Sequence, residues 1–600
     1  MSTLWGRNRR AHAVSHAQGG ASPRGRWMPA LAAPYVALLV GAVAGSLPAV
    51  LVSVAAALVI DPWVRRTWPD SEERLDTAGL GPVQRFFLRV VVLGLVVAAQ
   101  PGVTGLLAGS LLLGAGLVAV ACGLWTVLER RSRRRLRHRI AWQGLEGAGL
   151  PAGPPAITPA TFPGAAAGAV SVPPVEVFLL AGVVLSLALD TWTPAWGGLV
   201  LTLLVALAFV GEALRVERAS AQAPATADLM PTLVDALTRL APEVVVYFSS
   251  PDSGTYALRV WLDTIRRFTN PVLIVLREAH HLEQLDLAGL PVVVLPQAAD
   301  VEAAQVPSMR VVLYPTNVVK NNHMIRLPGL RHAFIGHGDS DKAGSFSPVT
   351  RVYDEIWVAG EAGRDRYVTA GEGVRPEQVR LVSRPQTAGL VRRPVGARPV
   401  PTVLYAPTWE GFYDESDYCS VASPGLEAVR ALVASGRVRV LFKPHPASGD
   451  RREDVLTALA GIEALVADAP HARVPDGPEA LYDAMNEADL LISDVSSVLS
   501  DWLACGRPYL VTNPQRLPAE ELHSRFPTTR GGAVLAPGED VLPLVDEAVG
   551  ADPMAGPREE LSRYLLGPHR QDPMQDFVDE VAAFVARTPS PRSDRLEEAR

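Results

Sequence analysis

Three long apolar stretches before residue 215 constrain the fold of this chain more than any other feature. They cover residues 31–60, 86–128 and 177–210. The first carries no charged side chain, and the other two carry one each, Arg89 and Asp190. Each stretch is too long for a single membrane span and suits two closely joined spans of roughly 15–21 residues.

A proline lies well inside each stretch, at Pro48, Pro101 and Pro194, where two arms of a hairpin would meet. We therefore expect a multi-pass α-helical membrane region at 31–215, made of three helical hairpins with about six segments. One long tilted helix is an alternative for the first stretch.

Arginines flank the apolar stretches, whereas the segments inside each expected hairpin have almost no Lys or Arg. The N-terminal segment 1–30 is basic, and arginines crowd residues 130–139 within a loop expected at 129–173. By the positive-inside rule these flanks are cytoplasmic, so the span count is even and the catalytic region faces the cytoplasm of a cell membrane. The arginine run beside a span fits an anchor to anionic membrane lipid, and the net charge of −6 does not favour nucleic acid as a partner.

The chain of 600 residues is too long for one core, and its pattern changes near residue 228. From there, short apolar runs alternate with amphipathic stretches, which indicates parallel sheets covered by helices on both faces. The pattern restarts after Arg392-Arg393-Pro394. We expect two Rossmann-like α/β halves, at 228–395 and 396–588, followed by a disordered tail at 589–600.

Four segments at expected strand ends carry candidate site residues. The first runs from Gly336 to Lys342, where two glycines leave His337 exposed and let a ligand approach the backbone. An imidazole there suits proton abstraction from a hydroxyl, and Lys342 supplies a point charge for phosphate. A turn with a solvent-facing histidine explains the same residues equally well. The substrate-binding candidates here are Gly336, Gly338, Asp339, Ser340 and Lys342.

The second and third segments follow strands of the second half. In Lys443-Pro444-His445-Pro446, the prolines fix the backbone around His445, and a rigid histidine suits stabilisation of a phosphoryl group. A proline-stiffened loop is the alternative. In Pro407-Thr408-Trp409, Thr408 offers a hydroxyl to a ligand, while the tryptophan is better explained as core.

The fourth segment joins a buried strand to a helix at Ser496 and Ser497. Ser496 occupies the expected N-cap position, and Gly506 the expected C-cap position. The free N–H groups at such a helix start favour an anion, which makes Ser496, Ser497 and the following Asp501 candidate substrate-binding residues. Many Rossmann-like strands end in this way with nothing bound.

Taken together, the four segments resemble those of the CDP-glycerol glycerophosphotransferase family, the polymerases and primases of teichoic-acid-type cell-wall polymers, which have a GT-B fold. The family motifs are His-Gly-x-x-x-Lys, Ala-Pro-Thr-Trp, His-Pro and Asp-x-Ser-Ser-Val ending in Asp, in the order found between about residues 240 and 585. The chain departs from the family in three places: Asp339-Ser340 stands for Thr-Pro, Lys443 for a frequent arginine, and Arg384-Pro385 for Pro-Arg.

The resemblance implies a transferase that moves glycerol phosphate, or a related polyol phosphate, from a CDP-alcohol to a hydroxyl of a lipid-linked or polymeric acceptor, with release of CMP. It implies that His337 is the general base and that His445 and Lys443 stabilise the transferring phosphoryl group. The motifs contain no carboxylate cluster, and the three cysteines lie far apart, so we expect no metal and no cofactor.

Two other functions are compatible with the sequence. The first is a GT-B glycosyltransferase using a nucleotide sugar, for which Asp494 and Asp501 are the nearest acidic pair. The second is a membrane scaffold with a degenerate transferase domain, which the presence of both His337 and His445 argues against.

Overall fold

The computed structural model describes residues 27–67, 75, 80–151, 175–250, 254–342, 348–370, 373–396, 398–411, 414, 417–568 and 571–589. Most of the basic N-terminal segment, part of the expected loop at 129–173 and the tail from residue 590 lie outside these ranges. The chain divides into two compact units. The helical unit comprises residues 1–138 and 155–224, and the α/β unit comprises residues 139–154 and 225–600.

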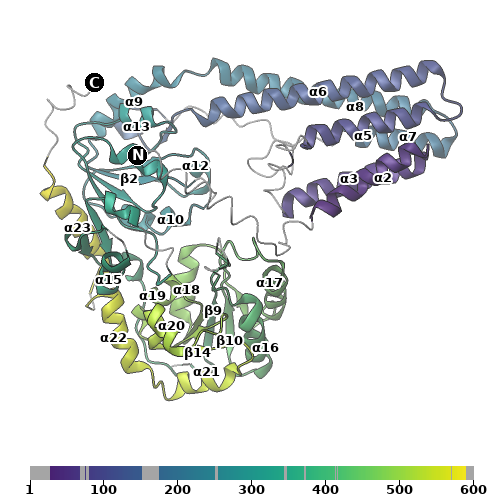
Figure 1. The fold of residues 1–600 in the computed structure, drawn as a ribbon. Helices are drawn as coiled ribbons and strands as arrows, with labels where there is room; N and C mark the ends of the chain where they lie inside the picture. Colours follow the sequence, from purple (N-terminus) through teal and green to yellow (C-terminus); the bar gives the residue numbers. More distant parts are fainter. Residues whose placement is uncertain are drawn as a thin grey trace. The chain divides into compact units, whose positions relative to one another are not determined.

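The helical unit contains six helices that pair into three hairpins among its described residues (Figure 1). The pairs are α2 (Trp27–Val43) with α3 (Leu47–Thr67), α5 (Pro82–Ala98) with α6 (Gly105–Arg137), and α7 (Val177–Leu189) with α8 (Thr193–Gln222). Each of the three prolines expected between hairpin arms lies in a connection or in the first turn of the second arm. Proline is tolerated there because the first turn of a helix leaves its N–H groups unpaired.

Three stretches within these helices are long and apolar enough to cross a membrane by length and composition: Leu47–Val64, Ala108–Ser132 and Thr193–Gln222. Two further apolar helices, Leu31–Val43 and Val177–Leu189, are shorter. The hairpins themselves are as expected, whereas the number of membrane spans stays a prediction.

Close packing holds the hairpins together. Gly182 of α7 lies against Gly198 of α8, where an added Cβ would approach the Pro194 carbonyl oxygen to 2.5 Å. Small residues at such a crossing let two backbones approach closely. One apolar core draws on all six helices, including Leu38, Val50, Val92, Leu111, Val183 and Leu199.

A buried polar cluster connects the same hairpins. The Arg89 guanidinium of α5 lies 2.7 Å from Asp61 of α3 and 2.6 Å from Glu176, which precedes α7. The Tyr35 hydroxyl of α2 donates to Asp61 over 2.8 Å, and Arg85 lies 3.3 Å from the same carboxylate. Arg89 therefore enters the apolar stretch as part of an ion-pair network rather than as an isolated charge.

The α/β unit begins with an eight-stranded sheet, which forms the first half. Its order is β1-β4-β3-β2-β5-β6-β7-β8, and all neighbours are parallel except β1, which runs antiparallel to β4. The strands are β1 (Ala141–Gln143), β2 (Val244–Phe248), β3 (Val272–Leu276), β4 (Val292–Val294), β5 (Val311–Tyr314), β6 (Arg331–Phe334), β7 (Glu355–Val358) and β8 (Val379–Leu381). The helices described here are α9 (Thr226–Leu240), α10 (Tyr256–Arg259), α11 (Leu262–Ile265), α12 (His281–Gln284), α13 (Ala298–Ala303), α14 (Asn322–Ile325) and α15 (Glu361–Ala370).

Apolar side chains on both faces of this sheet explain its continuous hydrophobic strands. Val245 and Tyr247 of β2 enter the core beneath α9, whereas Val244 and Val246 enter the core on the other face. Successive side chains of a strand point to opposite faces, so a strand buried on both sides contains no polar alternation.

A six-stranded parallel sheet forms the second half, with the order β11-β10-β9-β12-β13-β14. The strands are β9 (Thr402–Ala406), β10 (Arg439–Phe442), β11 (Ala472–Arg473), β12 (Leu490–Ser493), β13 (Tyr509–Thr512) and β14 (Ala533–Leu535). The helices are α16 (Leu426–Ser435), α17 (Glu453–Leu465), α18 (Pro478–Glu487), α19 (Ser497–Trp502), α20 (Ala519–Arg525), α21 (Val541–Gly550) and α22 (Ala555–Leu566). The α/β unit therefore has two halves, each built on a parallel sheet to which only β1 adds an antiparallel edge among the described strands.

One segment differs from the sequence expectation, and the last helix returns to the first half. The region expected as a basic loop is helical in α6 as far as Arg137, and β1 then joins the edge of the first sheet. The last helix, α23 (Pro573–Arg587), packs its Phe577 and Val581 into the core of the first half (Figure 1). Residues near the C-terminus thus complete the first half, because the apolar stripe of α23 is covered there rather than on the second sheet.

Candidate functional site

The loop after β6 presents His337. Gly336 has a φ of +60°, a backbone conformation that glycine adopts without strain, and its carbonyl accepts from Trp261 Nε1 over 2.7 Å. His337 itself is exposed, and its ring meets the Tyr256 ring edge-on, with centroids 6.4 Å apart. The glycine turn and the tryptophan together fix where the imidazole lies.

One hydrogen bond defines the tautomer of neutral His337. Its Nδ1 lies 3.1 Å from the Pro315 carbonyl oxygen, at the end of β5. Since a carbonyl oxygen only accepts, Nδ1 carries the proton and Nε2 keeps a free lone pair. Desolvation and the nearby Arg384 lower the pKa of His337 below its ordinary value. His337 is therefore arranged as a neutral base.

His445, in the loop after β10, has the opposite arrangement. Its Nδ1 accepts from the Ala447 N–H over 3.2 Å, so the neutral ring carries its proton on Nε2. The Trp409 ring stacks on the imidazole, with centroids 6.0 Å apart and planes 13° from parallel. Desolvation and the positive charges of Lys342 and Lys443 lower the pKa of His445 to about 4. The ring is therefore a neutral hydrogen-bond donor at neutral pH.

Lys342 connects the two halves. Its Nζ donates to Thr408 Oγ1 over 3.0 Å and lies 5.5 Å from the centroid of the Tyr418 ring. Desolvation lowers the pKa of Lys342, and the Asp494 charge partly opposes that shift. Ser340 is buried, and its Oγ accepts from the Lys342 N–H over 3.3 Å.

Asp339 lies next to this lysine but pairs with Arg366 of α15. The same arginine is 2.6 Å from Asp341, whose other oxygen accepts from Thr528 of the second half over 2.7 Å. The two carboxylates therefore lie in a protein network that joins the halves.

Lys443 and Pro444 are buried at the end of β10. Lys443 Nζ lies 3.4 Å from the Pro444 carbonyl and 3.9 Å from the exposed carboxylate of Asp476. Desolvation lowers the pKa of Lys443, which the distant Asp476 opposes. The Lys443 ammonium group is therefore buried, and its counter-charge is a carboxylate at the limit of ion-pair distance.

The segment at Ser496 and Ser497 lies opposite the glycine loop. A Cβ added to Gly338 would come within 3.1 Å of the Ser497 side chain, so a larger residue at this position would push the two loops slightly apart. Ser496 occupies the N-cap position of α19, as expected, but its hydroxyl does not cap the helix; it lies 3.4 Å from Ser493 Oγ. Gly506 ends the following turn with a φ of +66°, also as expected.

Asp501 faces protein groups. Both of its oxygens bond Arg384, with Nη2 at 3.0 Å, and Tyr482 donates to the same carboxylate over 2.9 Å. Asp494 is also fully buried, and its carboxylate accepts from the Thr408 N–H over 2.8 Å. Thus Asp494 fixes Thr408, and Asp501 fixes the Arg384 that joins the halves.

The structure thus brings residues of all four segments together, through the contacts of Lys342 with Thr408, Trp409 with His445, and Gly338 with Ser497. Sequence reasoning missed the residues that hold them: Trp261, Glu410 and the partnership of Arg384 with Asp501. Glu410 directly follows Trp409, and a charge in that apolar segment was the available signal. Within the ranges that the structure describes, no group of three or more His, Cys, Asp or Glu residues could hold a metal ion.

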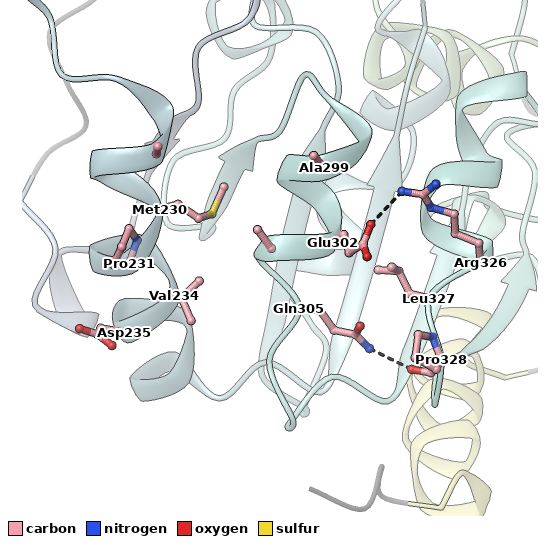
Figure 2. A pocket seen from close by; sticks show the side chains of 12 residues that line it. Met230, Pro231, Val234, Asp235, Ala299, Glu302, Gln305, Arg326, Leu327 and Pro328 are labelled. Atoms are coloured by element: carbon pink, nitrogen blue, oxygen red, sulfur yellow. Dashed lines mark hydrogen bonds and ion pairs between the residues drawn. The ribbon is translucent and has the colours of Figure 1, made fainter. Parts of the chain in front are cut away.

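A separate cavity of about 980 Å³ lies in the first half, between α9 and α13 (Figure 2). Met230, Val234 and Leu327 give it an apolar wall, and Glu302 pairs with Arg326 at its rim over 3.0 Å. Its lining residues include none of the site residues discussed above.

Several solved structures are similar to the α/β unit in outline. Anabaena Alr3699/HepE in complex with UDP and glucose is 14% identical, with 58% of this chain and 100% of that chain covered and a TM-score of 0.38. The wall teichoic acid polymerase TagF is 12% identical, with 60% and 93% covered and a TM-score of 0.39. A glycosyltransferase from Rickettsia africae is 11% identical, with 58% and 100% covered and a TM-score of 0.37.

A family comparison is more informative. No curated protein sequence is similar enough to count as a relative. Residues 389–516 match the model of the CDP-glycerol:poly(glycerophosphate) glycerophosphotransferase family. This segment contains Thr408, His445 and Ser496, the second-half members of the site. Residues 389–516 of this chain therefore resemble the CDP-glycerol:poly(glycerophosphate) glycerophosphotransferase family.

Proposed function

We propose that this protein transfers glycerol phosphate, or a related polyol phosphate, from a CDP-alcohol to a hydroxyl group of a lipid-linked or polymeric cell-wall acceptor. The acceptor oxygen attacks the β-phosphorus of the donor, and a new P–O bond forms. The P–O bond to the CMP leaving group breaks. The acceptor proton passes to His337 Nε2.

The opposite tautomers of the two histidines carry this proposal. In His337 the proton is on Nδ1, so Nε2 can accept a proton as a base. In His445 the proton is on Nε2, so the Nε2–H group can donate a hydrogen bond to a phosphoryl oxygen. Attack on phosphorus requires a base that removes a proton and a donor that stabilises charge on the phosphoryl group, and the two histidines have these two arrangements.

The remaining site residues serve the donor. Lys342 and Lys443 supply positive charge, and Ser496 and Ser497 supply hydroxyl and N–H donors to the pyrophosphate. Gly336, Gly338, Pro407 and Pro444 shape the loops, while Asp339, Ser340, Thr408 and Asp501 position the groups that touch the substrate. We place Asp501 in this supporting group because its carboxylate is already bonded by Arg384 and Tyr482.

The test is transfer from CDP-glycerol carrying a labelled glycerol. Membranes containing the protein are expected to move the label to a polyol-phosphate or lipid-linked acceptor. The same acceptor with its terminal hydroxyl methylated is the control and should accept nothing. Label transfer to neither acceptor, over a range of CDP-alcohols, overturns the proposal.

We further propose that the hairpins cross the cell membrane and that both the N-terminus and the α/β unit face the cytoplasm. The basic flanks outside each hairpin support this orientation. Reporter fusions after Arg10 and after Arg218 should report the same side. Opposite sides would mean an odd number of spans.

The acidic pair Asp494 and Asp501 does not support the alternative function as a glycosyltransferase. Asp494 is bonded by backbone N–H groups, and Asp501 by Arg384, so neither carboxylate faces a ligand as a free base or nucleophile.

A further inference from the structure

Glu410 is fully buried beside the candidate site, directly after Trp409. Its carboxylate accepts from the Gly449 N–H, at 2.9 and 3.2 Å from its two oxygens, and from the Arg452 N–H over 3.3 Å. These donors are backbone groups, and among the described residues no ion pair involves Glu410. Burial of a carboxylate costs free energy unless hydrogen bonds satisfy it. Glu410 therefore depends on these backbone N–H groups for its position.

Both donors belong to the loop that carries His445. This loop leaves β10 at Phe442 and enters α17 at Glu453. Inside it, the Ser448 N–H donates to the His445 carbonyl over 3.0 Å, and Gly449 has a φ of +88°. The carboxylate therefore holds the turn that begins at His445.

The neighbouring residue of Glu410 acts on the same histidine. Trp409 stacks on the His445 ring, nearly parallel to it. The backbone carbonyl of Glu410 also accepts from Arg451 Nη2 over 3.2 Å. The β9 loop thus holds the His445 loop at the imidazole ring, at two backbone N–H groups and at the Arg451 side chain.

We propose that Glu410 is the positioning residue for His445, fixing the loop so that the Nε2 proton faces the β-phosphoryl group of the donor. This inference rests on the proposed function, because it assigns His445 to the transferring phosphoryl group. Glu410 itself touches no reacting atom.

The proposal predicts a loss of turnover rather than of donor binding. A displacement of about 1 Å at a catalytic group costs roughly 10²-fold in rate. We expect Glu410→Asp, which keeps the charge but shortens the reach, to lower kcat about 10–100-fold with little change in KM for the donor. Glu410→Gln retains one acceptor oxygen, and its kcat should fall about 10-fold. Asp454→Asn is the matched control: it removes an exposed carboxylate bonded to the Arg452 side chain, 3.0 Å from Nε, and should stay within about 2-fold of the parent.

A double-mutant cycle separates positioning from general destabilisation. In a His445→Ala background, Glu410→Asp should cost less than about 2-fold in kcat, because the group it positions is gone. An equal loss in both backgrounds would overturn the proposal.

Hydrogen–deuterium exchange over residues 443–452 tests the physical connection without any turnover. The loop amides should exchange faster in Glu410→Asp than in the parent or in Asp454→Asn. Unchanged exchange overturns the proposal. If the full-length parent transfers nothing from any CDP-alcohol, the proposed function fails, whereas the exchange experiment still decides whether Glu410 holds the loop.

Discussion

Arg89 in the helical unit and Lys342 in the α/β unit are both cations enclosed by protein, but their neighbours differ. Arg89 lies between two carboxylates, at 2.6 and 2.7 Å, and the cluster around it contains two arginines and two acids. Lys342 donates to a hydroxyl and, among described residues, has no carboxylate within 4 Å of its Nζ. Lys443 has one, at 3.9 Å, on an exposed side chain.

The difference distinguishes structural from functional charge. In the Arg89 cluster, two carboxylates lie against two guanidinium groups, so the charges balance within the protein. Buried cations with a weak counter-charge favour an incoming anion, and desolvation by burial lowers the pKa values of Lys342 and Lys443. We therefore infer that the helical cluster holds helices together, whereas the site cations are reserved for phosphate.

The largest expected effect lies at the base. His337→Ala should lower turnover by roughly 10²–10⁴-fold while leaving donor affinity little changed, because a base acts in the transition state. Steady-state release of CMP from CDP-glycerol measures it. His471→Ala is the control, since that ring accepts from the Val440 N–H on the second sheet, away from the proposed chemistry. Near-parental turnover in His337→Ala would mean that His337 is a turn residue and not the general base.

The structural side of the comparison is tested by Arg89→Leu. Without Arg89, the buried Glu176 carboxylate loses its guanidinium partner, whereas Asp61 retains Arg85 and Tyr35, so we expect the free energy of unfolding in detergent to fall by about 3–5 kcal/mol. Arg215→Leu removes an arginine 2.6 Å from Glu212 in an exposed pair and should leave the free energy of unfolding nearly unchanged. An equal decrease in the free energy of unfolding in the two variants would show that the buried Arg89 cluster stabilises the protein no more than an exposed ion pair does.

Donor binding is expected to weaken in Ser497→Ala. The loss of one hydrogen bond to a charged phosphate should cost about 1–3 kcal/mol of binding free energy. Calorimetric titration of CDP-glycerol into the slow His337→Ala background measures it, with Ser435→Ala on the surface of α16 as the control. An unchanged affinity would remove Ser497 from the donor site.

The smallest effect is a shift of pH dependence. His337 acts as a base only when neutral, and its pKa lies below the ordinary 6.5. Activity should therefore persist as the pH falls to 6.5, and kcat/KM should decline only below that value. The pKa of His445, about 4, keeps that ring neutral over the same range. An acid limb with its midpoint above 6.5 would contradict the assignment.

Local patterns in the sequence predicted much of this fold. Apolar length and Pro101 indicated the helical hairpins, and the repeated strand pattern indicated two parallel sheets. The four segments were expected at strand ends, and the contacts of Lys342 with Thr408 and of Gly338 with Ser497 join loops of the two halves. These features depend on neighbours in sequence, where periodicity and turn residues are visible.

The remaining features depend on contacts between distant residues. The three residues of β1 are too few to show periodicity, and their role comes from pairing with β4. Asp501 was expected at the substrate, yet Arg384, 117 residues away, takes its carboxylate. Glu410 gives no sign in sequence of the backbone N–H groups that it accepts from, since a folded loop creates that arrangement.

In the proposed reaction the acceptor oxygen attacks phosphorus, and Lys342 and Lys443 are placed to bind the phosphates of the donor. Identification of the nucleotide released from CDP-glycerol, in the presence of a hydroxyl acceptor, tests it most directly. Attack on the β-phosphorus releases CMP, and we predict CMP as the sole nucleotide product, formed in step with acceptor elongation. Release of a nucleoside diphosphate, from this donor or from a nucleotide sugar, would mean attack on carbon and would contradict the assignment.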